Sequence, residues 1–182
     1  MGVQGRLFVI SGPSGAGLKE IVGRVIDSRA DIGRVVPVTA RKMKAGEVNG
    51  EAFWFYELEQ WEDMKARGDM LECTEFAGND YGTSRRLVEE QLAAGRNVLL
   101  NLSVERAAQV KRSMPAAVCV YVEPSPAVLR ERYRRIARSE FEVSVRMETA
   151  DRQRALAGFC DHVVNSDDIP AAVAAFNTLL DS

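Results

Sequence analysis

Short apolar runs alternate along the chain with stretches in which apolar residues recur every three or four positions. The runs "LFVI" (7–10), "NVLLNL" (97–102) and "AVCVYVE" (117–123) predict buried strands. After the first run, helical spacing predicts a helix whose apolar stripe is Leu18, Ile21, Val22, Val25 and Ile26. Strands and helices in alternation are typical of an α/β fold with a mostly parallel sheet.

A second pattern, rich in bulky strand formers, occupies residues 35–83. "RVVPV" (34–38), "AFWFY" (52–56) and "DMLECTEF" (69–76) predict strands around a helix near 58–67. These elements predict a small β-rich lobe inserted into the alternation, or rhythm, of strands and helices. That rhythm then resumes, with helices predicted at 84–94, 103–113, from Ser125-Pro126, at 142–157 and from Pro170, and a short strand "HVV" at 162–164. Serines at helix starts predict N-caps at Ser84, Ser103 and Ser125.

Length and charge limit the classes of function. A chain of 182 residues with 46% hydrophobic content fits one domain that buries roughly 70% of its unfolded surface. The net charge of −2 and the lack of an isolated basic block predict neither a nucleic-acid binder nor a membrane-surface protein. The longest basic run, Arg130 to Arg138, is either a solvated helix face or a local anion site.

Three distant cysteines, without C-x-x-C spacing, predict buried thiols in a reducing compartment and neither disulfides nor a metal site.

The single histidine, His162, opens a short apolar run and is expected at a strand edge rather than in catalysis. No apolar run reaches the length of a leader or a membrane span, so a cytoplasmic protein is expected.

The first predicted strand leads into a glycine loop. Glycines at 12, 15 and 17 follow the layout G-x-x-x-x-G-K-[ST], in which backbone N–H groups cradle phosphates. The candidate loop residues are Gly12, Ser14, Gly15, Ala16, Gly17, Leu18 and Lys19. Leu18 and Lys19 stand where the pattern requires lysine and a hydroxyl residue. A one-residue step turns a helix by about 100°, which predicts that Lys19 points away from the pocket that position 18 faces.

Several motifs together resemble the guanylate kinase family. They are "GRLFVISGPSGAG", "AGEVNGEAFWF", "GDMLECTEFAGNDYGTSR", "AAGRNVLLNLSVERAAQVK" and "DHVVNSDD", in order and over nearly the whole chain. The resemblance implies a reaction of ATP with GMP that gives ADP and GDP, with Mg²⁺. It also implies a phosphate-loop core (about 1–34, 84–125 and 158–182), a GMP-binding lobe (about 35–83) and a helical lid (about 126–157) in one guanylate-kinase-like domain.

The resemblance assigns the GMP-side residues. Glu72 stands at the family's guanine-reading glutamate, whose carboxylate accepts from N1–H and the exocyclic amine. Tyr81 matches a phosphate-binding position and Thr83 a base-binding one. Arg41 matches the first phosphate-gripping arginine, whereas Lys44 replaces the second and Phe53 replaces a phosphate-binding tyrosine.

Other positions depart from the family pattern. Asn101 and Ser103 stand where the family has acidic residues. The lid lacks the family's glycine turn, and Arg135 and Arg146 are its candidate catalytic arginines, with an uncertain alignment over 132–142. Pro37 resembles the non-enzymatic scaffold branch of the family, or it merely occupies a strand edge.

Three interpretations follow from these departures. The first is a homologue that binds GMP or a related guanine nucleotide and has lost, or nearly lost, ATP-dependent phosphoryl transfer. The second is an active guanylate kinase with compensating residues, which alone requires ATP and Mg²⁺. The third is a non-catalytic module that uses the GMP cleft to bind a protein or phosphopeptide. Losses spread over the loop, the acidic pair and the lid favour the first interpretation.

Overall fold

The computed structural model describes residues 4–182, so residues 1–3 of the predicted core lie outside the described residues. The strands are β1 (Leu7–Ser11), β2 (Ile32–Gly33), β3 (Val38–Thr39), β4 (Trp54–Phe55), β5 (Met70–Phe76), β6 (Asn79–Ser84), β7 (Asn97–Asn101), β8 (Val118–Glu123) and β9 (His162–Asn165). The helices are α1 (Leu18–Ser28), α2 (Leu58–Ala66), α3 (Arg85–Ala93), α4 (Val104–Ser113), α5 (Pro126–Arg134), α6 (Glu140–Leu156) and α7 (Ile169–Asp181), with a 3₁₀ turn at Ala157–Phe159.

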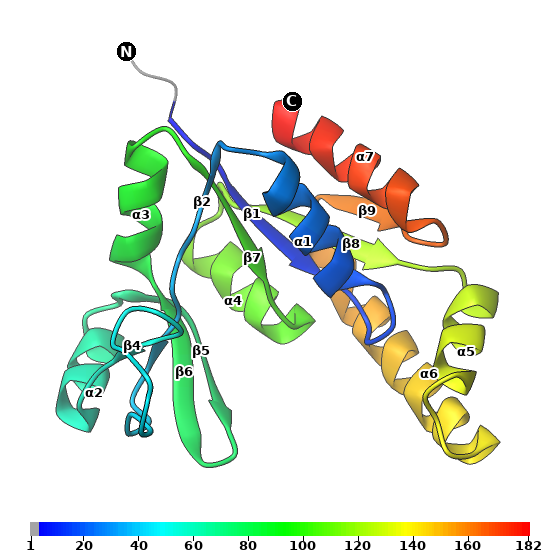
Figure 1. Cartoon of the computed structure of the whole chain (residues 1–182), viewed down its shortest axis with the longest axis horizontal. Helices are drawn as coiled ribbons and strands as arrows, with labels where there is room; N and C mark the ends of the chain where they lie inside the picture. The colour runs from blue at the N-terminus through cyan, green and yellow to red at the C-terminus, as the bar shows by residue number, and fades with distance from the viewer. Residues whose placement is uncertain (1–3) are drawn as a thin grey trace. The chain divides into compact units, whose positions relative to one another are not determined.

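Two sheets organise these elements (Figure 1). The first has five strands in the order β2-β7-β1-β8-β9, and the β1–β8, β8–β9 and β2–β7 pairs are parallel. The second has four strands in the order β4-β3-β6-β5 and contains antiparallel pairs. The predicted α/β class and the predicted β-rich insertion are therefore both confirmed. No helix within residues 4–182 combines the length and the apolar character needed to cross a membrane.

The chain divides into two compact units. Unit 1 contains Asp31–Val98, Ala108–Ala117 and the described residues up to Leu7. Unit 2 contains Phe8–Ala30, Leu99–Ala107 and Val118–Ser182. This division assigns the glycine loop and both lid helices to unit 2 and the Glu72 region to unit 1.

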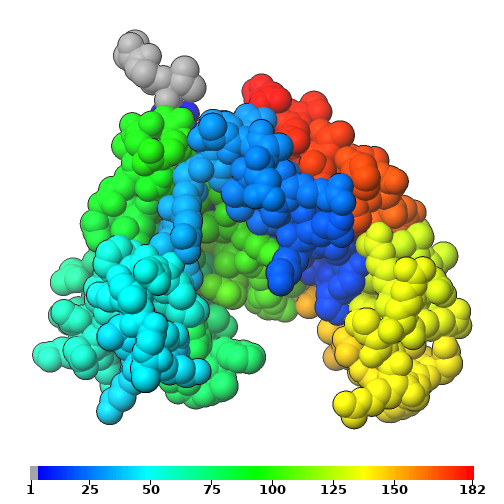
Figure 2. Space-filling view, in the orientation of Figure 1, coloured from blue at the N-terminus to red at the C-terminus, as the bar shows by residue number. Residues whose placement is uncertain are grey.

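Unit 2 is built around β1, in which all five residues are buried because apolar side chains occupy both faces of a central parallel strand. Helices α1 and α7 contact each other, and the ring of Phe176 on α7 lies edge-on to Phe8 at 6.2 Å between centroids. Helices α5 and α6 form a second apolar cluster with Leu129, Tyr133, Val143, Met147 and Ala150. In Figure 2 α5 and the start of α6 form a continuous yellow surface.

Unit 1 has its own core, formed by Val38, Trp61, Met64 and Met70 under the second sheet. Strands β5 and β6 pair antiparallel, and the register shifts between Met70 and Glu72. From α4, the Gln109 side chain accepts a hydrogen bond from the Cys73 backbone N–H (2.9 Å) and donates one to the Cys73 carbonyl (3.1 Å). This double contact fixes the β5 backbone beside the Glu72 position.

Two local predictions need correction. The run "RVVPV" is not a strand: only Val38 of it lies in β3, and Arg34–Pro37 is irregular because proline cannot donate to a ladder. The Pro37 carbonyl still accepts from the Trp54 N–H at 2.9 Å, directly before β3, which is an inner strand of its sheet. Ser84 is buried at the end of β6, and its side chain makes no cap hydrogen bond.

Other helix starts follow the predicted chemistry. The Ser125 hydroxyl accepts from the Val128 N–H before Pro126, as predicted. Helix α6 begins at Glu140, two residues before the predicted start, because Ser139 caps it by accepting from the Glu142 N–H at 3.2 Å. His162 is exposed in the edge strand β9, as predicted.

Candidate functional site

The glycine loop connects the buried end of β1 to the first turn of α1. A side chain at Gly12 would place its Cβ 2.3 Å from the Val122 carbonyl oxygen. Gly17 has a φ of +83°, and a Cβ there would lie 2.4 Å from the Ile169 side chain. Only glycine permits these backbone positions. The packing of unit 2 therefore fixes the shape of the loop.

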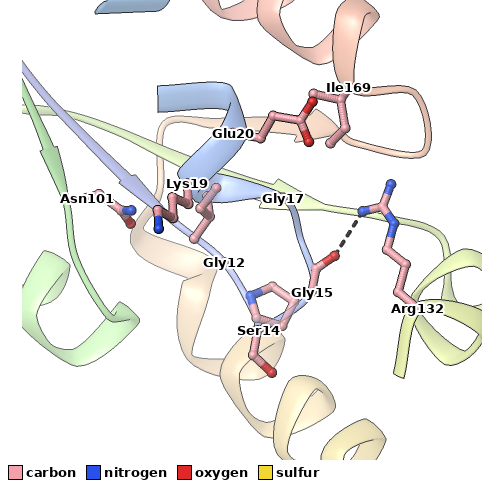
Figure 3. A pocket seen from close by; sticks show the side chains of 11 residues that line it. Gly12, Ser14, Gly15, Gly17, Lys19, Glu20, Asn101, Arg132 and Ile169 are labelled. Atoms are coloured by element: carbon pink, nitrogen blue, oxygen red, sulfur yellow. Dashed lines mark hydrogen bonds between the residues drawn. The ribbon is translucent and has the colours of Figure 1, made fainter. Parts of the chain in front are cut away.

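The loop encloses a pocket of about 830 Å³ (Figure 3). It is lined by Gly12, Pro13, Ser14, Gly15, Gly17, Leu18, Lys19, Glu20, Asn101, Arg132 and Ile169. The first N–H groups of α1 have no partner within the helix, and Gly17 supplies no side-chain cap. Together they give this end of the helix a partial positive charge, which favours an anion in the pocket.

Lys19 lies in this pocket, so the prediction that it points away is wrong. Leu18 and Lys19 both line the pocket, and Figure 3 shows the Lys19 ammonium directed toward Asn101. The pocket extends around the end of the helix, so a long side chain reaches it from the neighbouring helix face. Among residues 4–182, Lys19 has no hydrogen-bond or ion-pair partner. Glu20 instead pairs with Arg24 at 2.7 Å.

Arg132 lines the pocket, although it is not among the site residues assigned from the sequence. Its guanidinium donates to the carbonyls of Gly15 (2.9 Å), Ser166 (2.6 Å) and Asp167 (3.2 Å). Arg132 lies in the basic run Arg130 to Arg138, which the sequence offers as a candidate anion site. This run is the sequence feature that points to Arg132. Nearby, the Ser14 hydroxyl donates to the Tyr133 hydroxyl at 3.3 Å. These contacts hold the loop against α5.

The two predicted lid arginines do not line the loop pocket. Arg135 is exposed and pairs with Glu131 at 3.7 Å. Arg146 pairs with Glu142 at 2.7 Å, and its guanidinium lies 5.9 Å from the centre of the Tyr133 ring. Both arginines thus pair with a glutamate four residues earlier in the chain.

In unit 1, Glu72 and Thr83 come together across β5 and β6. They are register partners, and the Thr83 hydroxyl donates to the Glu72 carboxylate at 2.6 Å. Their exposed fractions are 2% and 3%. A carboxylate and a hydroxyl held this way are preorganised, because neither has rotamer freedom left to lose.

Arg41 is the centre of a second cluster in unit 1. Its guanidinium donates twice to Glu47, at 2.8 Å each, and lies 5.5 Å from the centre of the Phe53 ring. Hydrogen bonding to Glu47 raises the pKa of Arg41, with a smaller contribution from the Tyr81 hydroxyl. Tyr81 and Phe53 are neighbours, with ring centroids 5.6 Å apart. The structure therefore brings Arg41, Phe53 and Tyr81 together in one cluster, and a role of this cluster in binding stays a prediction.

Glu47 was not singled out from the sequence. Hydrogen bonds from the Arg41 side chain and the Lys44 backbone N–H lower its pKa to about 2. The Lys44 side chain is exposed beside this cluster.

Asn101 lines the loop pocket in unit 2, whereas Ser103 is exposed just before α4 and does not line it. The two positions that lack the family's acids thus have different surroundings.

Comparison with known proteins bears on these clusters. The family profile described as Guanylate kinase matches residues 4–182. A guanylate kinase of Synechococcus sp. (strain CC9902) is 39% identical over 180 residues, covering 98% of this chain and 96% of the relative. The chain belongs to the guanylate kinase family. A guanylate kinase of Lactiplantibacillus plantarum is 34% identical, covering all of this chain and 90% of that protein.

The fold is also that of a solved guanylate kinase. The crystal structure of guanylate kinase from Anaplasma phagocytophilum superposes with a TM-score of 0.68 and 23% identity, covering 98% of this chain and 85% of that one. A shikimate kinase from Bacteroides thetaiotaomicron superposes more loosely, with a TM-score of 0.52 and 14% identity. At these identities the likeness concerns the fold alone.

Members of the guanylate kinase family are expected to use Mg²⁺, and the pocket residues can be tested for it. Mg²⁺ prefers oxygen ligands in octahedral geometry. In this pocket Lys19, the residue after Leu18, carries an ammonium in place of an oxygen ligand. Asn101 offers an uncharged amide, and the Glu20 carboxylate is paired with Arg24. Within residues 4–182, no group of three His, Cys, Asp or Glu side chains could hold a metal ion. The residues of the loop pocket therefore do not fit a Mg²⁺ site.

Proposed function

We propose that this member of the guanylate kinase family binds GMP in unit 1 and transfers phosphoryl from ATP at a strongly reduced rate. The Glu72–Thr83 pair carries the proposal. A carboxylate has about four acceptor positions; the Thr83 hydroxyl takes one of those of Glu72, which also makes a further contact. Guanine presents two adjacent donors that match a carboxylate, and adenine presents no such pair. Glu72 therefore selects guanine.

The cluster around Arg41 supports a phosphate next to the base. Glu47 holds the Arg41 guanidinium in one orientation, so little conformational entropy is lost when further N–H groups of Arg41 contact a phosphate. Tyr81 adds a hydroxyl, and the exposed Lys44 adds a charge. Phe53 contributes only its ring. Fewer directional donors than the family pattern has predict weaker binding of GMP.

The reduced rate follows from the loop pocket. The phosphate-loop lysine reaches the β- and γ-phosphates and the next hydroxyl binds Mg²⁺. Leu18 and Lys19 provide neither at those positions, and Asn101 and Ser103 are uncharged. Arg135 and Arg146 are paired with glutamates. Loss of one preorganised donor typically costs about 10² to 10³ in rate.

A working guanylate kinase is the second candidate, and the comparisons favour it over loss of activity. The relatives named above are guanylate kinases along almost their whole length. The position of Lys19 also favours it, because the ammonium enters the pocket that Leu18 lines and could take over charge stabilisation there. The peptide-binding interpretation gains no comparable support from the described residues. For either candidate we propose the cytoplasm as the compartment, from the cysteine pattern.

Turnover decides between the two candidates. Purified protein with Mg²⁺, ATP and GMP is assayed for GDP formation. We expect no more than about one thousandth of a typical turnover number of about 10 s⁻¹. A turnover near 10 s⁻¹ would establish the working enzyme instead.

Binding tests the part of the proposal that concerns unit 1. Calorimetry with GMP and with AMP should give heat for GMP and none for AMP. Equal binding of the two nucleotides, or binding of neither, contradicts selection of guanine by Glu72.

A further inference from the structure

The residues of the loop pocket do not fit Mg²⁺, so protein groups have to balance the charge of any phosphate that binds there. We propose that the loop pocket binds the diphosphate of a nucleoside diphosphate as a free anion, without a divalent metal, and that the Lys19 ammonium supplies the positive charge. This inference rests on the family membership that underlies the proposed function. It concerns unit 2, whereas selection of GMP concerns unit 1.

The charges around the pocket support binding without metal. Lys19 is a cation with no partner among the described residues, and it is directed into the pocket beside Asn101. The N-terminus of α1, a helix of 11 residues, adds partial positive charge. The Arg132 guanidinium lines the same pocket. A divalent cation would find no set of anionic protein ligands among the residues that line the pocket.

Glu20 does not reverse this balance. It is the only acidic residue among those that line the pocket, and Arg24 pairs with it one helical turn further on. In Figure 3 the Glu20 side chain lies near Ile169, whereas Lys19 extends toward Asn101. The Lys19 ammonium therefore stays available to a phosphate.

The chemistry of the loop favours a diphosphate over a triphosphate. Backbone N–H groups of a glycine loop cradle the α- and β-phosphates, and the loop lysine reaches the β- and γ-phosphates. The glycine positions that shape this cradle are present, as the tight contacts of Gly12 and Gly17 show. Leu18 removes the loop lysine's contacts to both the β- and the γ-phosphate. A third phosphate would add negative charge with no metal to neutralise it.

Calorimetry with ADP as the probe tests the inference on the full chain. Titrations are made in EDTA and in excess Mg²⁺, and repeated with ATP. We expect ADP to bind in EDTA at least as tightly as in Mg²⁺, and ATP to bind no more tightly than ADP. Lys19→Gln should weaken ADP binding about tenfold, the typical effect of one charge-assisted hydrogen bond. Lys19→Arg should retain most of the affinity.

The matched control is Lys65→Gln, which removes an exposed lysine from α2 in unit 1 and should leave ADP binding unchanged. Lys19 is itself exposed, so its substitution should not prevent folding. A requirement for Mg²⁺, the absence of ADP binding, or full affinity in Lys19→Gln overturns the inference. GMP binding is measured in the same preparations. If ADP binds without metal and GMP does not bind, the proposed function fails while this inference stands.

Discussion

The glycine loop of unit 2 and the Glu72 site of unit 1 differ in what they share with the family pattern. In the loop the backbone glycines are present, but the two residues that should follow them are replaced by Leu18 and Lys19. In the Glu72 site the two side chains that we propose to read the base are joined by a hydrogen bond. The loop thus has the glycines of the pattern without its charged and hydroxyl side chains, whereas the Glu72 site has the side chains that the pattern predicts.

Burial accounts for this difference. Glu72 is buried within the β5–β6 register, so a replacement there would leave the Thr83 hydroxyl without its acceptor. Lys19 is exposed and Leu18 is half-buried, so replacements at these positions cost little stability. Gly12 and Gly17 are constrained by close contacts. Stability alone therefore preserves the loop backbone and permits its functional side chains to change.

The largest expected effect comes from repairing the loop with Leu18→Lys, Lys19→Ser and Glu20→Thr together. Restored charge and hydroxyl ligands should raise the affinity for Mg·ATP about a hundredfold, as two charge-assisted contacts would. Binding should become dependent on Mg²⁺, while GDP formation stays low because Ser103 is unrepaired. Calorimetry and a GDP assay measure the two effects.

The control for this repair is the double variant Lys19→Ser, Glu20→Thr, which keeps Leu18 and should not gain affinity for Mg·ATP. Normal GDP formation by the triple variant would show that the loop was the only damaged part. Failure to bind Mg·ATP would show that the loop backbone does not cradle phosphates.

The next effect concerns the base site. Glu72→Gln keeps the size of the side chain but replaces an acceptor by a donor, which opposes the donors of guanine. GMP affinity should fall by about thirtyfold, in the range of a hydrogen bond to a charged group. ADP binding should not change. Glu75→Gln, at an exposed position of the same strand, is the control, and equal losses in both variants would contradict the assignment of Glu72.

A smaller effect is expected at Arg132, which holds the loop through backbone carbonyls. Arg132→Met keeps the aliphatic stem and removes three hydrogen bonds. The midpoint of thermal unfolding should fall by about 5 °C, corresponding to about 2 kcal/mol in a domain of this size. Arg135→Met removes only an exposed pair and should leave the midpoint unchanged within about 1 °C. Similar midpoints for the two variants would mean that Arg132 does not hold the loop.

The smallest effect is the pH dependence of the Arg41–Glu47 pair. The pKa of Glu47 falls from 4.5 to about 2 on folding, so its contribution to stability is present above pH 4.5 and is lost as pH falls toward 2. The stability difference between wild type and Glu47→Gln should be constant from about pH 5 to 8 and shrink below that. Urea unfolding at several pH values measures it. A difference that grows on acidification would contradict the shift.

The strands and helices that could be predicted were those with strong local patterns. β1, β7 and β8 are continuous apolar runs, and Ser125-Pro126 marks a helix start. Other features depend on tertiary contacts. Ser84 looks like a cap but ends a strand, and Arg34–Pro37 looks like a strand but finds no ladder partners.

The site was predictable to a similar degree. The proximity of Glu72 to Thr83 and of Arg41 to Tyr81 could be expected because they lie in motifs with fixed spacing, and their binding roles stay predictions. The direction of Lys19 could not, because a helical rotation angle does not describe how a pocket surrounds a helix end. Arg132 is far from the loop in sequence, and only the packing of α5 brings its guanidinium to Gly15.

The double contact of Gln109 with Cys73 also bears on how the protein behaves at high concentration. β5 is the last strand of its sheet, and a last strand exposes backbone groups that can pair with another molecule and start aggregation. The Gln109 amide imitates a neighbouring strand by accepting from the Cys73 N–H and donating to its carbonyl. One side chain of α4 thus occupies the backbone groups through which a second copy would begin to add to the sheet.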